Sequence, residues 1–268
     1  MAQGLSELEQ FYEGDAYCGF AGDFNVGRYR AYADFVLAHA RGAVHEIGSG
    51  LGQAAYALHE RGVAVVATDI FPDNARKTFG ARGIRIPVEK LNVYRVELPP
   101  GSVENFCCYQ VMEHIERPQL ALAELYRALR PGGRLIVVGP NLISPLATGK
   151  NLVMGLLGKW EFPLLGKRGA YSFPHGDNLV QIFLRVFRNA ALTALKLALP
   201  SARRAMFRTP CLVKPAISDS DAVFLLNPMD LAALMRAAGF EITSYQAPQR
   251  WGSWAGSTWL VGEKPKNG

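Results

Sequence analysis

The sequence has 268 residues, of which 49% are hydrophobic and 19% are charged, and its formal net charge is +6. This length suits one large domain, or one domain with a sizeable insertion. The apolar content is ample for a core, and the four cysteines have no metal-ligand spacing. These features exclude a mainly disordered chain and a fold held together by disulfides. No uncharged apolar run reaches the ~18 residues of a membrane span. The first ten residues lack the pattern of a secretory signal, so we expect a cytoplasmic protein with free thiols.

The positive charge is concentrated in one part of the chain. Residues 142–215 contain eleven basic and two acidic residues, a net of +9, which leaves −3 for the rest of the sequence. A charge asymmetry of this size between segments indicates something about partners rather than about the fold. We therefore interpret 142–215 as an insertion with its own task.

Outside this insertion, short β-rich runs alternate with helical patterns, which is typical of βαβ units in one doubly wound α/β domain. Strands are predicted, in chain order, at 43–47, 63–67, 84–88, 106–109 and 135–138, with a terminal strand pair at 240–245 and 257–261. Helices are predicted at 54–60, 73–79, 118–129 and 228–238. Pro131-Gly132-Gly133 is expected to end the third helix, and Asn227 with Pro228 to begin the fourth. Cys107 and Cys108 fall inside the fourth strand and are predicted core thiols.

A glycine-rich turn follows the first predicted strand. Glycines at 48, 50 and 52 let backbone N–H groups approach a ligand at the carboxyl edge of a parallel sheet. A dinucleotide fingerprint would need a further glycine at position 53, which is Gln53, and the chain contains no Walker sequence. The pattern Glu46-x-Gly48-x-Gly50-x-Gly52 resembles motif I of the class I S-adenosylmethionine-dependent methyltransferases.

Further segments resemble that family's motifs in the same order. They are Asp69 at the end of the second strand, Asn92-Val93 before Leu98-Pro99, Gln110-Val111-Met112-Glu113-His114-Ile115 after the fourth strand, Leu129–Leu135, Pro140-Asn141 and Ala238-Gly239-Phe240. The resemblance covers about 28–141 and 219–263. It implies a Rossmann-like, doubly wound seven-stranded sheet with an antiparallel last strand, and a mostly helical insertion after strand five. The implied domains are N-terminal capping helices at 1–42, a methyltransferase domain at 43–141 and 216–268, and the insertion at 142–215.

The resemblance also implies S-adenosylmethionine as cofactor, with no metal. It assigns Asp69 to the two ribose hydroxyls, Asn92 to the adenine amino group and Gln110 to a position along the cofactor. Arg28 could close over the methionine carboxylate or the acceptor, or could belong only to an amphipathic helix face. The predicted cofactor-binding residues are Arg28, Glu46, Gly48, Ser49, Gly50, Gly52, Gln53, Asp69, Ile70, Asn92, Val93 and Gln110.

Methyl transfer from a sulfonium needs an aligned nucleophile and exclusion of water, and a hydroxyl or carbon acceptor also needs a base. His114, just beyond the fourth strand, is the first candidate for the base, because histidine titrates near neutrality. A structural histidine bonded to nearby backbone is the alternative. His175 is a second candidate, or a solvated turn histidine. Glu113 is interpreted as structural, capping the helix that follows.

The insertion contains a predicted basic amphipathic helix at 178–199. Its polar face is expected to comprise Gln181, Arg185, Arg188, Asn189 and Lys196, and its apolar remainder Leu179, Ile182, Phe183, Val186 and Phe187. Such a helix can be a lid whose apolar side covers the active site or a dimer partner, or an element that contacts an anionic membrane. A basic, aromatic RNA-binding surface is the third alternative.

These observations predict a methyltransferase for a small, hydrophobic or lipid-like acceptor, with oxygen as the favoured receiving atom. One alternative is an enzyme that acts on tRNA or protein through the basic insertion. Another is a catalytically silent cofactor-binding module. No proline-cysteine or amino-group motif directly follows the fourth strand, which disfavours nucleobase methylation and nucleic acid as a partner. The sequence leaves open whether the protein is a monomer or a homodimer.

Overall fold

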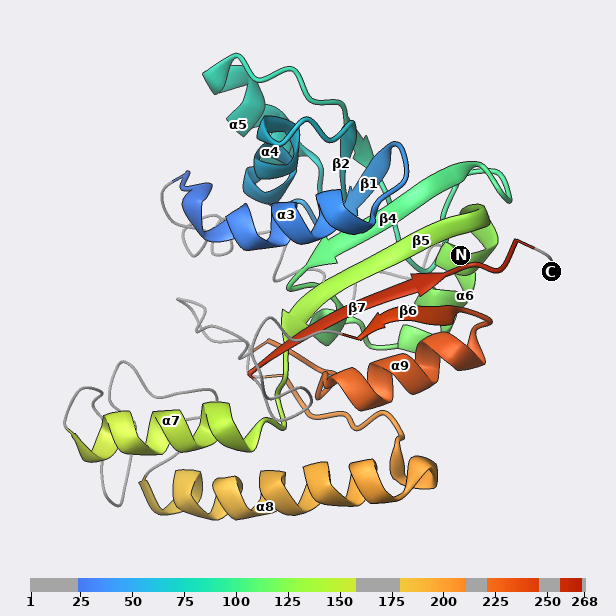
Figure 1. Ribbon diagram of the computed structural model, residues 1–268. Helices are drawn as coiled ribbons and strands as arrows, with labels where there is room; N and C mark the ends of the chain where they lie inside the picture. Colours follow the sequence, from blue (N-terminus) through green and yellow to red (C-terminus); the bar gives the residue numbers. More distant parts are fainter. Residues whose placement is uncertain (1–23, 158–178, 211–220, 246–255, 267–268) are drawn as a thin grey trace, which may run out of the picture.

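The structure is a computed structural model that describes residues 24–157, 179–210, 221–245 and 256–266. Within these residues seven strands form one sheet in the order β3-β2-β1-β4-β5-β7-β6 (Figure 1). Strands β1 to β5 pair in parallel, whereas β7 is antiparallel to both β5 and β6, as predicted. The strands are β1 Val44–Ile47, β2 Val65–Asp69, β3 Val88–Lys90, β4 Val103–Tyr109, β5 Leu129–Pro140, β6 Glu241–Tyr245 and β7 Ser257–Glu263.

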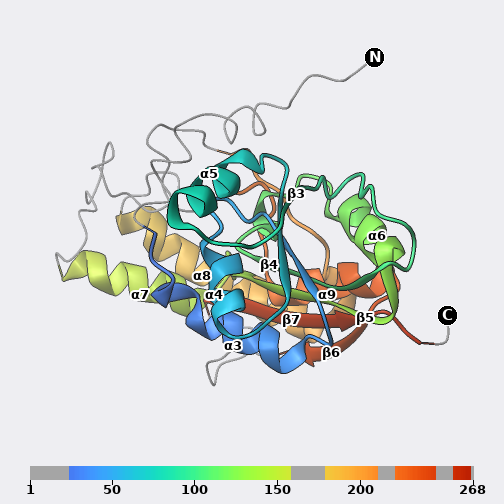
Figure 2. The same ribbon diagram turned by 90° about the horizontal axis from the view of Figure 1, so that it is seen from above.

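Helices cover both faces of this sheet (Figure 2). One face packs against α3, α4 and α5, and the other against α6 and α9. The helices are α3 Arg30–His39, α4 Gln53–Glu60, α5 Asp73–Arg82, α6 Pro118–Ala128, α7 Pro145–Leu156, α8 Leu179–Ala198 and α9 Pro228–Ala237, with short 3-10 turns η1 Gly27–Tyr29, η2 Met112–His114 and η3 Pro200–Ala202. The arrangement confirms the predicted doubly wound, Rossmann-like fold.

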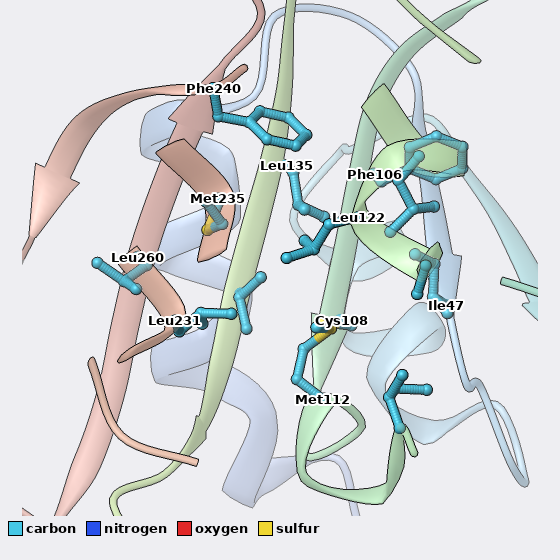
Figure 3. Close-up of a cluster of buried hydrophobic side chains, with 14 of the residues drawn as sticks. Ile47, Phe106, Cys108, Met112, Leu122, Leu135, Leu231, Met235, Phe240 and Leu260 are labelled. Carbon is cyan, nitrogen blue, oxygen red and sulfur yellow. The ribbon is translucent and has the colours of Figure 1, made fainter. Parts of the chain in front are cut away.

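Two apolar clusters form the core because successive strand residues point to opposite faces of the sheet. Phe106, Cys108 and Leu135 pack toward α6 and α9 (Figure 3), whereas Cys107 and Ile136 pack toward α3 and α4. The two adjacent cysteines therefore lie on opposite faces, both buried and both free, which confirms the prediction of core thiols.

Two predicted boundaries were wrong. The third strand begins at Val88, where pairing with β2 starts, rather than at Ile84. Pro87, which precedes it, has no N–H to donate to a ladder. Helix α6 ends at Ala128, before Pro131, and β5 already begins at Leu129. The Pro131-Gly132-Gly133 turn lies within β5, because the Gly132 N–H donates to the Lys264 carbonyl at 2.8 Å and the Gly133 carbonyl accepts from Lys264 at 2.9 Å.

The predicted start of the last helix is confirmed. The Asn227 side chain caps α9 by accepting from the Asp230 N–H at 3.0 Å, and Pro228 occupies the first turn. The Lys196 Nζ from α8 donates to both oxygens of the Asp230 carboxylate, at 2.8 and 2.9 Å, and both side chains are buried. This buried ion pair joins the insertion to the methyltransferase fold.

No helix among the described residues is both long enough and apolar enough to pass through a membrane.

Candidate active site

The glycine turn connects the end of β1 to the start of α4. Gly48 and Gly52 have φ angles of +69° and +83°, in the left-handed region that favours glycine. A Cβ at Gly48 would collide with the Val111 side chain, and a Cβ at Gly52 would collide with the Phe79 ring. The close packing therefore requires glycine at both positions and fixes the path of the turn between β1 and α4.

Asp69, at the end of β2, fixes the turn from one side. Its Oδ2 accepts from the Gly50 N–H at 2.8 Å, and its Oδ1 accepts from the Phe71 N–H at 2.9 Å. Burial raises the pKa of this carboxyl, opposed by these backbone hydrogen bonds. A carboxylate oxygen can accept more than one hydrogen bond, so Asp69 can hold the turn and still receive ribose hydroxyls.

Glu46 and Ser49 present buried polar atoms beside the same turn. The Glu46 Oε2 and the Ser49 Oγ have no hydrogen-bond partner among the described residues. Burial raises the pKa of Glu46 well above its ordinary value, and the neighbouring Asp69 carboxylate raises it further. Buried polar atoms are nearly always hydrogen-bonded in native proteins, so these two atoms indicate a polar ligand at the turn. Together with the glycine cradle, they fit S-adenosylmethionine.

Arg28 reaches the turn through a chain of hydrogen bonds. Its Nη2 donates to the Tyr29 hydroxyl at 2.8 Å, and that hydroxyl donates to the Gln53 Oε1 at 3.2 Å. Burial raises the pKa of Tyr29, so its hydroxyl stays protonated and able to donate. Because Gln53 is the first residue of α4, this chain places η1 beside the glycine turn, where a methionine carboxylate is expected.

Asn92 and Val93 follow β3, next to the end of β2. The Leu91 N–H donates to the Asp69 carbonyl at 2.9 Å, which brings this loop beside Asp69 and Ile70. The Asn92 Oδ1 accepts from the Tyr94 N–H at 2.8 Å. This bond orients the Asn92 amide and leaves the oxygen a second lone pair for the predicted adenine contact.

Gln110 has an unusual backbone conformation at the end of β4. Its φ angle is +58°, and it is the one non-glycine residue with positive φ in the part of the chain that the structure describes. Its N–H donates to the Val138 carbonyl at 2.8 Å, and the next residue, Val111, packs on Gly48. Strained backbone of this kind concentrates at functional sites. Its place beside the glycine turn agrees with the predicted contact to the cofactor.

His114 lies in η2 between two carboxylates. Its Nδ1 is 3.4 Å from the Asp221 Oδ2, and its Nε2 is 3.8 Å from the Glu113 Oε1. Glu113 is fully buried, and Asp221 is nearly so. Sequence reasoning missed Asp221, because only the fold brings it to a histidine more than a hundred residues earlier. The two carboxylates therefore flank the imidazole ring, one beside each ring nitrogen.

The predicted capping role of Glu113 was wrong. Helix α6 begins after Arg117 with no side-chain cap. The Glu113 carbonyl instead accepts from the Val223 and Phe224 N–H groups, at 2.9 and 3.0 Å, and so fastens the segment that carries Asp221. The other catalytic candidate, His175, lies outside the described residues. Within them, no group of three or more His, Cys, Asp or Glu residues is placed to hold a metal ion.

The comparisons with known proteins agree with this site. A family model described as a methyltransferase domain matches residues 45–137. A demethylmenaquinone methyltransferase of Deinococcus radiodurans is 33% identical over 175 residues, which cover 58% of this chain and 71% of that protein. Methyltransferase tpcM of Aspergillus fumigatus is 34% identical over 101 residues, covering 37% of this chain and 31% of that protein.

Among solved structures, a methyltransferase from Thermotoga maritima, described as a possible histamine N-methyltransferase, superimposes with a TM-score of 0.55 and 18% identity. That alignment covers 95% of this chain and 99% of the other. A putative S-adenosylmethionine-dependent methyltransferase from Methanococcus maripaludis has a TM-score of 0.53 at 14% identity, covering 100% and 99% of the two chains. At these identities the likeness concerns the fold alone.

Glycine turn, strand-end acid and sheet order together define a class I methyltransferase fold built around a nucleoside cofactor. The chain belongs to the class I S-adenosylmethionine-dependent methyltransferases. It is a transferase whose cofactor is S-adenosylmethionine.

Proposed function

We propose that the protein methylates a hydroxyl oxygen of a small, hydrophobic acceptor, and that His114 removes the proton of that hydroxyl. The observation that carries this proposal is the His114 imidazole between Glu113 and Asp221, one turn beyond the carboxyl end of β4. The Deinococcus relative is a demethylmenaquinone methyltransferase, which supports a small-molecule acceptor.

The cofactor-binding residues would act by holding S-adenosylmethionine in a fixed place. Asp69, Asn92 and the backbone of the glycine turn would hold the nucleoside, and Arg28 would meet the methionine carboxylate. Bound S-adenosylmethionine supplies a methyl group on a positively charged sulfur, which is already an activated leaving group. The protein therefore has to align the acceptor oxygen with that methyl group and exclude water.

The proton moves through His114. Asp221 beside Nδ1 favours the tautomer with the proton on Nδ1, which leaves the Nε2 lone pair to act as base. The Nε2 of His114 would take the proton of the acceptor hydroxyl as that oxygen becomes methylated. Asp221 is thus a positioning residue for His114.

The test is methyl transfer from radiolabelled S-adenosylmethionine to a panel of apolar phenols and hydroxyquinones, with unfractionated tRNA and protein as competing acceptors. We expect label on the small apolar hydroxyl compounds. The His114→Asn variant should lower kcat by about 10²-fold or more, because general base catalysis typically contributes that much. Its affinity for S-adenosylmethionine should stay within about twofold, because His114 contacts the acceptor rather than the nucleoside.

Two further variants sharpen this test. Asp221→Asn should lower kcat, with cofactor affinity unchanged, and Asp221→Glu should restore part of the rate. The exposed His59 on α4 gives a matched control, so His59→Asn should behave as the wild type. Label transferred only to tRNA or protein, or a His114→Asn enzyme as fast as the wild type, would contradict the proposal.

A further inference from the structure

Helix α8 turns polar side chains toward the fold and apolar side chains toward solvent, which is the opposite of an ordinary surface helix. The side that faces away from the fold is mainly apolar, and Phe183, Leu184 and Phe187 in the first half of the helix are 49%, 60% and 60% exposed. A surface helix of a soluble protein normally turns its apolar side to the core and its polar side to water. The exposed apolar residues, at helical spacing, are Val180, Phe183, Leu184, Phe187, Ala191, Ala194, Leu195 and Ala198.

The side of α8 that faces the fold carries buried polar groups with partners. The Asn189 Nδ2 donates to the Thr148 Oγ1 on α7 at 3.0 Å, and the Thr193 hydroxyl donates to the Ile143 carbonyl at 3.4 Å. Lys196, one turn further, forms the ion pair with Asp230. These contacts fix the rotation of α8 about its axis, and they therefore hold its apolar side toward solvent. Asn189 and Lys196, two residues of the predicted polar face, are thus buried against the fold rather than exposed on the basic surface.

Helix α7 extends the apolar surface. It lies beside α8 beyond the carboxyl end of β5, at the same end of the sheet as the glycine turn (Figure 1). Val153, Leu156 and Leu157, at and just beyond its end, are also exposed. We call the exposed apolar residues of these two helices the α7–α8 face. Large apolar side chains exposed on two neighbouring helices mark a site of contact with another apolar body.

Among the residues of the insertion that the structure describes, the charges on α7, α8 and the segment after them have one sign. Residues 142–157 and 179–210 contain seven basic residues and no acidic residue. Lys196 is neutralised by Asp230, whereas Lys150, Arg188 and Arg204 are exposed. A second copy of the same face would bring like charges together, which disfavours a symmetric dimer. A surface that combines anionic headgroups with an apolar interior complements both the basic side chains and the exposed apolar side chains of the α7–α8 face.

We propose that the α7–α8 face docks on a bilayer that contains anionic phospholipid. The apolar side chains of α8 would enter the boundary between headgroups and acyl chains, and the basic side chains would pair with lipid phosphates, as interfacial amphipathic helices do. Docking would turn the active-site end of the sheet toward the membrane. The proposal concerns the surface alone, holds for any acceptor, and is tested without one.

The test is co-sedimentation of the full-length protein with vesicles of phosphatidylcholine alone and of phosphatidylcholine with phosphatidylglycerol. We expect binding to the anionic vesicles that weakens as salt is raised, and much weaker binding to the neutral ones. The Phe183→Asp/Phe187→Asp variant should lower vesicle affinity by at least about tenfold, because it places two charges in the apolar side. Both side chains are exposed, and retention of S-adenosylmethionine binding shows that the variant is folded.

The matched control is Leu37→Asp/Leu120→Asp, which adds the same charge at equally exposed leucines on α3 and α6. It should bind vesicles as the wild type does. Absence of vesicle binding by the wild type, or equal loss in both double variants, would overturn the proposal. So would sedimentation of the wild type as a dimer that the Phe183→Asp/Phe187→Asp change dissociates without lowering vesicle affinity, because the face would then be a protein interface.

Discussion

Glu46 is the residue whose environment departs furthest from that of an ordinary carboxyl in the site. It is buried, its Oε2 has no partner among the described residues, and Asp69 lies near it. Its pKa is therefore well above the usual 4.5 in the folded protein. In the window between the unfolded and the folded pKa, the native state binds more protons than the unfolded chain. The free energy of unfolding therefore falls as pH rises through that window.

Replacing this carboxyl should remove its part of the pH dependence. We expect the cofactor-free Glu46→Gln variant to gain stability relative to the wild type as pH increases from 5 to 8. Asp69, whose pKa is also raised, still contributes the same trend in both proteins. Urea denaturation across this range measures the difference. Glu97→Gln, at an exposed position, should follow the wild type, and a Glu46→Gln curve parallel to the wild type would contradict the account.

Only some residues of the candidate site could be predicted from the sequence. The glycine turn and Asp69 were predictable because their spacing along the chain is local. Asp221 was not, because it lies more than a hundred residues from His114 and is brought there where the Glu113 carbonyl accepts from the N–H groups of residues 223 and 224. The positive φ of Gln110 was also unpredictable, since glutamine has no preference for that region.

At the scale of elements, the Lys196–Asp230 pair is the contact that holds α8 to α9. Removing one partner of a buried pair leaves an uncompensated charge. Lys196→Met should therefore lower the free energy of unfolding by about 3–5 kcal/mol. Lys196→Met/Asp230→Asn should cost less than the single change, because no buried charge is left. Chemical denaturation measures both, and Lys150→Met, exposed on α7, serves as the control. Equal stability of the Lys196→Met and Lys150→Met proteins would refute this role.

Element boundaries were predicted well where local signals were strong. Helix α8 was predicted at 178–199 and spans Leu179–Ala198, and the Asn227 cap of α9 was identified from its residue type. Helical periodicity predicted that α8 has one polar and one apolar face. It could not predict which face points toward the fold, because that depends on the partners of Asn189 and Lys196 in distant elements. Likewise, the turn at Pro131 looked like a helix end, yet pairing with Lys264 makes it part of β5.

At the scale of the whole molecule, the net charge of +6 describes neither part of the protein. The methyltransferase fold has the mild negative charge of an ordinary enzyme, whereas the insertion carries the whole positive excess. The structure places α7 and α8 beyond the carboxyl end of β5, at the active-site end of the sheet (Figure 1). The basic charge and the exposed apolar side chains of the insertion therefore lie at the same end as the glycine turn.

Isothermal titration of the full-length protein with S-adenosylmethionine tests the central claim most directly, which is that the glycine turn and Asp69 bind this cofactor. We expect one site per chain, and about 2.7 kcal/mol of added stability when the cofactor is at a hundred times its Kd. Asp69→Asn should weaken binding at least about tenfold, because its amide nitrogen cannot accept a ribose hydroxyl. The exposed Asp73→Asn control should bind as the wild type. A folded wild-type protein that gives neither binding heat nor thermal stabilisation would contradict the account.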